Sequence, residues 1–231
     1  SSSVYAGGLV GNNDYGDIMN SYATGNVNAS SSSSYSSVCA GGLVGYNDGS
    51  YINNSIITNC YALGNVNAGV TYNSSNADAY AGGLVGYNDN SVITNSYATG
   101  NVSVTSSSSS SSVYAGGLVG YNNYGDIMNG YATGNVSAIS SSSSSSSVYV
   151  GGLVGGDNGT IKNSYRYSNQ TISVKEGTSI SNEPTNTEGT AKDLETLQLV
   201  SFHTSTLGWD SAVWNIVEGE FPTLKNVGVI W

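Results

Sequence analysis

Aspartate is the residue type in this sequence that could most readily do chemistry. Two carboxylates at a suitable separation can hydrolyse a glycosidic bond, and a group of them can bind calcium. Of the six aspartates considered, Asp14, Asp48 and Asp89 lie in "ND" pairs at equivalent positions of a repeated sequence, where Asp is a common turn former. The six are Asp14, Asp17, Asp48, Asp89, Asp126 and Asp157. We therefore interpret them as turn residues, with calcium binding as an open alternative.

Other catalytic groups are scarce. The single histidine, His203, lies outside the repeats, so a nucleophile triad or a multi-histidine metal site has no starting point. Polysaccharide lyases usually need a strong cation or base, and the repeats supply only Lys162 and Arg166, both in the last copy. We predict no enzymatic activity and no cofactor.

Repeats are the elements that must position all of these residues. The pentapeptide "GGLVG" begins five times, at steps of 34, 41, 34 and 35 residues, and a block of the type "NSYATGNV" follows each copy. The long step comes from a five-residue insertion between Gly45 and Ile57, which we expect to form a surface loop. The five copies start at Gly7, Gly41, Gly82, Gly116 and Gly151.

Each repeat predicts short strands joined by turns. In "SYATGNV", small or apolar residues alternate with Tyr22, Thr24 and Asn26, which is the period of a strand. No 3.6-residue period is present, and Gly, Asn and Ser are poor helix formers. A repeat of this length cannot bury its apolar face alone, whereas stacked copies can. We predict an all-β parallel β-solenoid of about five coils.

The motif also predicts the core and the corners of each coil. We expect Leu9, Val10, Ile18, Val27 and their equivalents to form the core. The glycines would supply a positive φ or a close backbone approach. The asparagine before each "SYA" block can adopt the left-handed conformation and stack from coil to coil. These asparagines are Asn20, Asn59, Asn95, Asn129 and Asn163.

A column of tyrosines is the candidate binding surface. If the alanine of "SYA" points inward, the tyrosine before it points outward in every coil. Aromatic rings beside hydroxyl groups suit contact with a glycan or a protein, although stacked tyrosines also stabilise a solenoid by packing alone. The candidate ligand-binding residues are Tyr22, Tyr61, Tyr97, Tyr131 and Tyr165, with Thr24, Thr99 and Thr133 beside them.

Composition narrows the class of partner. Charged residues make up 9% of the chain and its formal net charge is −10. Binding to nucleic acid requires Lys and Arg, of which the chain has five, so we predict no nucleic-acid partner. No apolar run approaches the roughly 18 residues of a membrane span, so we predict no membrane insertion by this segment. The chain opens within a repeat and without Met, and we expect it to be a piece of a longer protein.

The repeats resemble the GLUG motif, whose signature G-L-V-G recurs at Gly8–Gly11, Gly42–Gly45, Gly83–Gly86, Gly117–Gly120 and Gly152–Gly155. The resemblance extends from about Ser1 to Asn169, and the stretch from Leu207 to Leu224 resembles the segment that often closes such arrays. GLUG repeats occur in large bacterial surface and secreted proteins, including adhesin-like proteins and some IgA-specific metallopeptidases. The resemblance brings no catalytic residues, and it implies a bacterial stalk or binding array.

The cysteines and the serine runs give two further predictions. Cys39 and Cys60 both fall in the second repeat, where two buried free thiols are the favoured prediction and a disulfide is the alternative. The serine runs at 30–34, 106–112 and 140–147 cannot build a core, so we expect solvated edges or loops there, with O-glycosylation as the alternative.

After residue 169 the repeats end and the pattern of the sequence changes. We predict a solenoid over residues 1–169 and a small α+β capping segment over 170–231. Residues Ala191 to Phe202 predict a helix with Thr190 as its N-cap, and residues 212–219 predict a strand. The capping segment would cover the last coil, because an open solenoid end is an exposed strand edge. Its expected core is Trp209, Trp214, Phe221, Leu194 and Leu197.

Together these features predict a secreted or cell-surface, adhesin-like protein that acts as a stalk or binding array for a host or extracellular glycan or protein. The first alternative is a structural filament or matrix subunit that self-associates through the ends of the solenoid. The second is a polysaccharide-processing β-helix enzyme.

Overall fold

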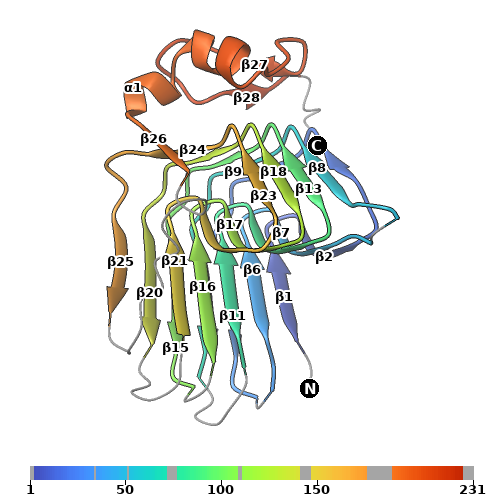
Figure 1. Cartoon of the computed structure of the whole chain (residues 1–231), viewed down its shortest axis with the longest axis vertical. Coiled ribbons are helices and arrows are strands. Elements are labelled where there is room, and N and C mark those ends of the chain that lie inside the picture. The colour runs from blue at the N-terminus through green and yellow to red at the C-terminus, as the bar shows by residue number, and fades with distance from the viewer. Residues whose placement is uncertain are drawn as a thin grey trace.

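The chain folds as a parallel β-solenoid, as the repeats predicted. The computed structural model describes residues 3–33, 35–50, 52–71, 77–108, 111–140, 147–175 and 189–225. Each coil contributes one strand to each of five parallel sheets, which we name A to E in the order in which the chain enters them. Figure 1 shows the equivalent strands of successive coils side by side, from blue at the N-terminal coil to orange at the last.

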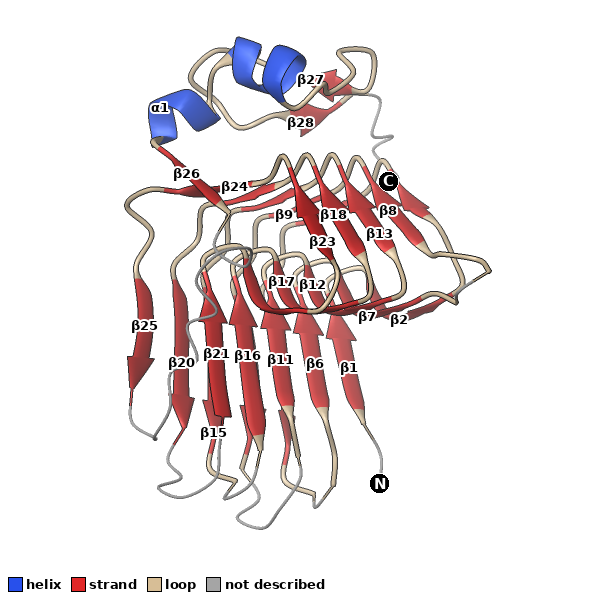
Figure 2. Cartoon of the chain, in the orientation of Figure 1, coloured by secondary structure: helices blue, strands red, loops and turns tan. Residues whose placement is uncertain are grey.

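Sheets A and B are formed by the strands on either side of the "GGLVG" motif. Sheet A contains β1 (Val4–Gly7), β6 (Val38–Gly41), β11 (Ala79–Gly82), β16 (Ser112–Gly116) and β21 (Ser147–Gly151). Sheet B contains β2 (Val10–Asp14), β7 (Val44–Asp48), β12 (Val85–Asp89), β17 (Val119–Asn123) and β22 (Val154–Asp157). The two sheets meet at an angle in Figure 2.

Sheets C, D and E are formed by the remainder of each coil. Sheet C contains β3 (Ile18–Met19), β8 (Ile56–Thr58), β13 (Val92–Thr94), β18 (Asp126–Met128) and β23 (Thr160–Lys162). Sheet D contains β4 (Tyr22–Ala23), β9 (Tyr61–Ala62), β14 (Tyr97–Ala98), β19 (Tyr131–Ala132), β24 (Tyr165–Tyr167) and β26 (Thr190–Lys192). Sheet E contains β5 (Val27–Ser31), β10 (Val66–Val70), β15 (Val102–Ser106), β20 (Val136–Ser140) and β25 (Ile172–Lys175).

The number of coils is slightly lower than the five predicted. Four turns lead from β1 to β21, and the strands from β21 to β25 form a further, less regular turn. In that last turn Arg166 takes the position of the inward alanine, and Gly156 takes that of a tyrosine. We therefore describe the solenoid as about four regular turns. Its strands continue beyond Asn169, since β25 pairs with β20 and β26 pairs with β24.

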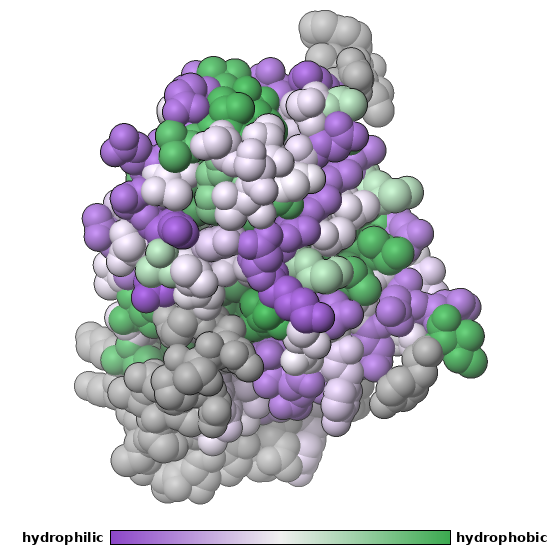
Figure 3. All heavy atoms as spheres, turned by 45° about the horizontal axis from the view of Figure 1, so that its top comes forward, coloured by the Kyte–Doolittle hydropathy of each residue, from purple (hydrophilic) through white to green (hydrophobic). Residues whose placement is uncertain are grey.

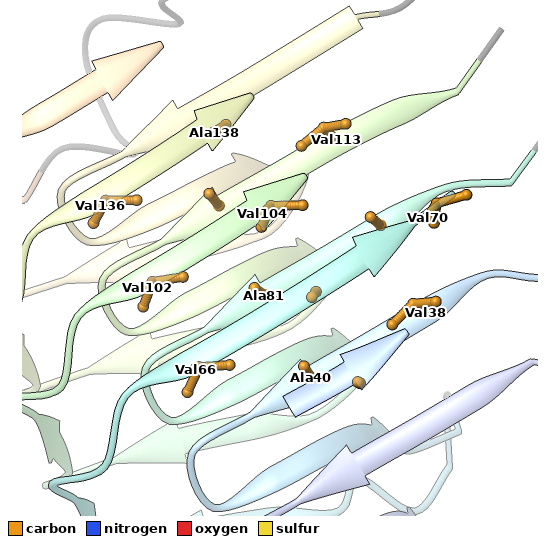
Figure 4. Close-up of a cluster of buried hydrophobic side chains, with 14 of the residues drawn as sticks. Val38, Ala40, Val66, Val70, Ala81, Val102, Val104, Val113, Val136 and Ala138 are labelled. Carbon is orange, nitrogen blue, oxygen red and sulfur yellow. The ribbon is translucent and has the colours of Figure 1, made fainter. Parts of the chain in front are cut away.

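The interior of each coil is divided into two cores. Valine and alanine from sheets A and E pack in one core, where their alternation with outward residues follows the period of two (Figure 4). The second core, between sheets B, C and D, contains the larger Leu and Ile side chains, such as Leu84 and Ile93. Leu and Val of "GGLVG" both belong to this core in the inner coils. The prediction that Leu9 belongs to the core is wrong, because this side chain, in the first coil, is 49% exposed.

Asparagines shape the corners and also form a ladder that the sequence did not predict. The asparagine before each "SYA" block has a positive φ, between 46° and 53°, in all five coils, as predicted. A second set lies inside the solenoid, where each side-chain amide donates to the side-chain oxygen of the next coil at 2.7–2.9 Å. This asparagine ladder consists of Asn13, Asn47, Asn88 and Asn122, and Asp157 accepts its last hydrogen bond.

The motif glycines act through close approach rather than through a positive φ. None of the "GGLVG" glycines has a positive φ. A Cβ on Gly83 would lie 2.8 Å from the Cβ of Ala98 and would collide with the backbone oxygen of Gly117. Sheets A, B and D can approach each other this closely only without a side chain at that position.

The loops between the coils agree only in part with the predictions. The insertion in the second repeat forms the loop that projects before β8 in Figure 1, and Ile52 in it is 90% exposed. Ser31, Ser106 and Ser140 are buried at the ends of strands of sheet E, so these parts of the serine runs are not solvated as predicted. The predictions for residues 34, 109–110 and 141–146 lie outside the described residues.

Of the predicted capping segment, β26 extends the last coil by pairing with β24, and the part that follows, the C-terminal segment, lies across the side of the solenoid. It consists of α1 (Leu194–Leu197), a π-helix η1 (Phe202–Thr206), β27 (Trp214–Asn215) and β28 (Thr223–Leu224). Figure 1 shows it spanning several coils above sheet D. The predicted helix is shorter than expected and its N-cap is Asp193, because Thr190 belongs to β26. Leu194 is exposed, whereas Leu197, Trp209 and Trp214 are buried.

Candidate binding site: the tyrosine corner

The tyrosines predicted to bind a ligand do form a column, but the C-terminal segment covers most of it. Neighbouring rings stack with centroids 4.9–5.2 Å apart. One buried cluster contains the three central tyrosines, Tyr61, Tyr97 and Tyr131, together with Trp209, Trp214 and other residues of the C-terminal segment. The outer surface of the C-terminal segment faces the viewer in Figure 3. At the ends of the column, Tyr22 is exposed and Tyr165 is partly buried. The alanine that follows each of the first four tyrosines does point inward.

Polar contacts fix the C-terminal segment on these rings. The Tyr97 hydroxyl donates to the Pro222 carbonyl at 2.6 Å, and the indole N–H of Trp209 donates to the Asn129 carbonyl at 3.0 Å. Thr24 is exposed beside the column, whereas Thr99 and Thr133 are partly buried. The three central tyrosines thus contact this chain's own C-terminal segment, and no external ligand can reach them in this arrangement.

A second set of tyrosines faces outward, from sheets A and B. In sheet A, inward valine and alanine flank an outward tyrosine, and in sheet B the tyrosine precedes the buried asparagine of the ladder. Because the two sheets meet at an angle, rings of one sheet contact rings of the other. We call this surface the tyrosine corner: Tyr5, Tyr80, Tyr114 and Tyr149 from sheet A, with Tyr46, Tyr87 and Tyr121 from sheet B.

The rings of the tyrosine corner form one continuous set of contacts. Within sheet A, Tyr114 stacks on Tyr80 and on Tyr149 with centroids 5.0 and 4.7 Å away. Between the sheets, Tyr80 meets Tyr87 edge to face at 4.9 Å, and Tyr114 meets Tyr121 at 4.8 Å. Cys39 replaces a tyrosine in the second coil and is buried. The surface therefore spans the whole length of the solenoid.

Carboxylates border the tyrosine corner on both sides. The Tyr46 hydroxyl donates to Asp89 Oδ2 at 3.3 Å, and the Tyr80 hydroxyl donates to Asp78 Oδ2 at 3.2 Å. Burial is the main cause that raises the pKa of Tyr114 to about 12, and burial followed by the charge of Asp78 raises the pKa of Tyr80 further. These hydroxyls therefore stay protonated at neutral pH, and they can donate and accept hydrogen bonds.

The sequence contained a signal for this surface. Tyrosine recurs in "VYAGG" and in "GYND" with the same period of two that located Tyr22 and its equivalents. That pattern alone predicts two more outward columns. The contact between them could not be predicted, because it depends on the angle between sheets A and B.

Both cysteines are free and buried, so the alternative of a disulfide is wrong in this structure. Burial, and next the charge of Asp78, raises the pKa of the Cys39 thiol to about 12. Burial also raises the pKa of the Cys60 thiol to about 12, although hydrogen bonds with backbone groups at Ser21 and Thr58 oppose the shift. Neither thiol can act as a nucleophile at neutral pH.

No group of three or more His, Cys, Asp or Glu side chains in the described ranges is arranged to hold a metal ion. Among the described residues there is also no helix of the length and apolar character needed to cross a membrane.

Comparison with known proteins agrees with the repeats seen in the structure. The family model of the GLUG motif matches residues 2–28, 36–67, 77–105 and 111–137, which correspond to the first four coils. The less regular fifth copy is not among the matched ranges. No curated protein and no solved structure matched the chain. With four successive motifs between residues 2 and 137, each forming one coil of the solenoid, the chain belongs to the family of GLUG-motif repeat proteins.

Proposed function

We propose that this chain is an adhesin-like binding array of the cell surface or the secreted space, and that the tyrosine corner is its binding surface. The observation that supports the proposal is the continuity of the corner: seven tyrosines from two sheets contact one another along all the coils. A surface of this shape suits an extended glycan or polypeptide that runs along the solenoid axis.

The physical character of the rings favours recognition. Tyrosine offers a large apolar area and a polar hydroxyl at a small cost in conformational entropy. Here the rings project from paired strands, so their positions are fixed before a ligand arrives, which lowers the entropic cost of binding. The exterior location that we propose accords with the occurrence of GLUG repeats in surface and secreted proteins. Binding, not catalysis, is the activity that we propose.

A binding array tests the proposal. The purified chain would be applied to immobilised glycans and extracellular-matrix proteins beside the variant Tyr46→Ser/Tyr121→Ser. We expect selective binding by the wild-type chain and its loss in the variant, because both rings belong to the tyrosine corner.

The matched control is Tyr15→Ser/Tyr35→Ser. Both tyrosines are 58% exposed, have positive φ angles at turns and belong to none of the ring contacts of the corner described above. Far-UV circular dichroism would establish that all three proteins are folded. The proposal is wrong if the wild-type chain binds nothing, or if both double variants bind as well as the wild-type chain.

A further inference from the structure

The tyrosine corner lies in a field of uncompensated negative charge. Residues 1–161 contain seven aspartates and no Lys, Arg, Glu or His. Four of the five basic residues of the chain belong to strands of the last coil or to the strand added to it, and the fifth, Lys225, also lies beyond residue 161. The four are Lys162, Arg166, Lys175 and Lys192. No basic side chain from the first four coils can therefore neutralise the carboxylates beside the corner.

The carboxylates are stacked on one another where sheet B borders the corner. Asp14, Asp48 and Asp89 are direct partners on neighbouring parallel strands. Like charges opposite each other in a sheet are destabilising. Burial, then the charge of Asp89 and then that of Asp14, raises the pKa of Asp48. A cationic group beside this row would remove a repulsion that exists in the free protein.

We infer that the partner of the tyrosine corner is a basic, extended polypeptide segment, whose arginine or lysine side chains lie on the tyrosine rings and pair with Asp48 and Asp89. The inference rests on the proposed function and specifies its ligand. Guanidinium groups stack on aromatic rings and pair with carboxylates in two-point hydrogen bonds, so one arginine can use both features of the surface.

Charge separates this partner from the other ligand classes. An acidic glycan or a phosphate-bearing polymer would meet the repulsion of Asp48, Asp78 and Asp89. A neutral glycan could stack on the rings, but it would leave the row of carboxylates uncompensated. A basic segment gains from both the rings and the charges, and charge complementarity also accelerates its association.

The test uses a deca-arginine peptide as the probe. Its binding to the whole chain would be measured by isothermal titration calorimetry at low and high salt, for the wild-type chain and for Asp48→Asn/Asp89→Asn. We expect the variant to bind about tenfold more weakly, and the wild-type affinity to fall as salt rises. The variant should fold, since the change removes a repulsion. The amide oxygen can still accept the hydrogen bonds that Asn90 and Asn123 donate to Asp89 Oδ1, and the amide N–H can donate to the Tyr46 hydroxyl.

The control for general charge is Asp17→Asn/Asp126→Asn, which removes the same charge next to sheet C. We expect its affinity to stay within about twofold of the wild type. An equal loss in both double variants would overturn the inference, because the probe would then sense only net charge.

A neutral oligosaccharide, cellohexaose, separates the inference from the proposed function. One outcome is that cellohexaose binds the wild-type chain and Asp48→Asn/Asp89→Asn equally well but binds Tyr46→Ser/Tyr121→Ser more weakly, and that the arginine peptide does not bind. In that case the inference is wrong and the proposed function stands. If neither probe binds and the array also shows no ligand, both are wrong.

Discussion

At the scale of the residue, the asparagine ladder is the feature that most directly holds one coil to the next. Asn88 has no exposed surface, accepts from the Asn47 amide at 2.9 Å and donates to Asn122 Oδ1 at 2.8 Å. Each side chain in the ladder satisfies its neighbours, so removal of one leaves a buried donor and a buried acceptor without partners. Asp157 can only accept, and it therefore closes the ladder in the last coil.

We predict that Asn88→Ala lowers the free energy of unfolding by about 2–4 kcal/mol, because two neighbouring amides lose buried hydrogen bonds. Urea unfolding followed by far-UV circular dichroism would measure the change. Asn67→Ala is the control, since the exposed Asn67 amide makes a similar bond to Asn28 and its loss can be replaced by water. A control that loses as much stability as Asn88→Ala would contradict the explanation.

Gly100 and Gly25 occupy the same position of the motif and give a second comparison. A Cβ on Gly100 would collide with the backbone of Gly64, whereas a Cβ on Gly25 would meet no atom within 4 Å. We predict that Gly100→Ala costs at least about 3 kcal/mol or prevents folding, and that Gly25→Ala changes stability by less than about 1 kcal/mol. Thermal unfolding of both variants checks this, and equal melting temperatures would contradict it.

At the scale of the element, strands could be predicted from the sequence and lateral packing could not. The alternation in "SYATGNV" located the outward Tyr97 and the inward Ala98, and the spacing of "GGLVG" predicted the parallel pairing of their equivalents. Nothing in that local pattern shows that Trp209 and Trp214 lie on Tyr97. Those contacts join residues more than a hundred positions apart, and they depend on where residues 193–225 return to the solenoid.

The same elements give the C-terminal segment a pH-sensitive contact. His203 is buried between the segment and sheet D, its Nδ1 donates to the Leu199 carbonyl at 2.9 Å, and the Tyr131 hydroxyl donates to its Nε2 at 3.4 Å. Burial lowers the pKa of His203 to about 4. The folded state thus prefers the neutral ring, and stability present above about pH 6.5 is lost as the pH falls toward 4.

We predict that up to about 3 kcal/mol of the stability of this contact is lost between pH 6.5 and pH 4, and that the C-terminal segment loosens before the solenoid unfolds. Trp209 and Trp214 lie in this segment, so their emission, recorded in a Trp231→Phe background, reports on the segment, while far-UV circular dichroism reports mainly on the strands. His203→Gln keeps a donor for Leu199 but does not titrate. An unchanged pH profile in that variant would show that other groups cause the transition.

At the scale of the whole molecule, the solenoid is a stack in which each coil contacts mainly its two neighbours. Strand partners in sheets A to E are always equivalents from adjacent coils, so the register repeats with each turn. The C-terminal segment adds the only long-range layer among the described residues, and it contacts sheet D in several coils through residues of repeated type. Stability should then be close to a sum over coils and their interfaces.

This organisation predicts that one whole coil can be removed. Deletion of Gly82–Ala115 joins Ala81 to Gly116, and because Ala81 is the register partner of Ala115, every strand keeps an equivalent neighbour. The C-terminal segment would then meet Tyr61 in place of Tyr97 and Asn20 in place of Asn59. We expect a folded chain whose free energy of unfolding is lower by roughly 2–5 kcal/mol, with unchanged tryptophan emission. Deletion of Gly82–Ala98, about half a coil, breaks the register and should prevent folding. If both deletions unfold the chain, its stability is not additive over the coils.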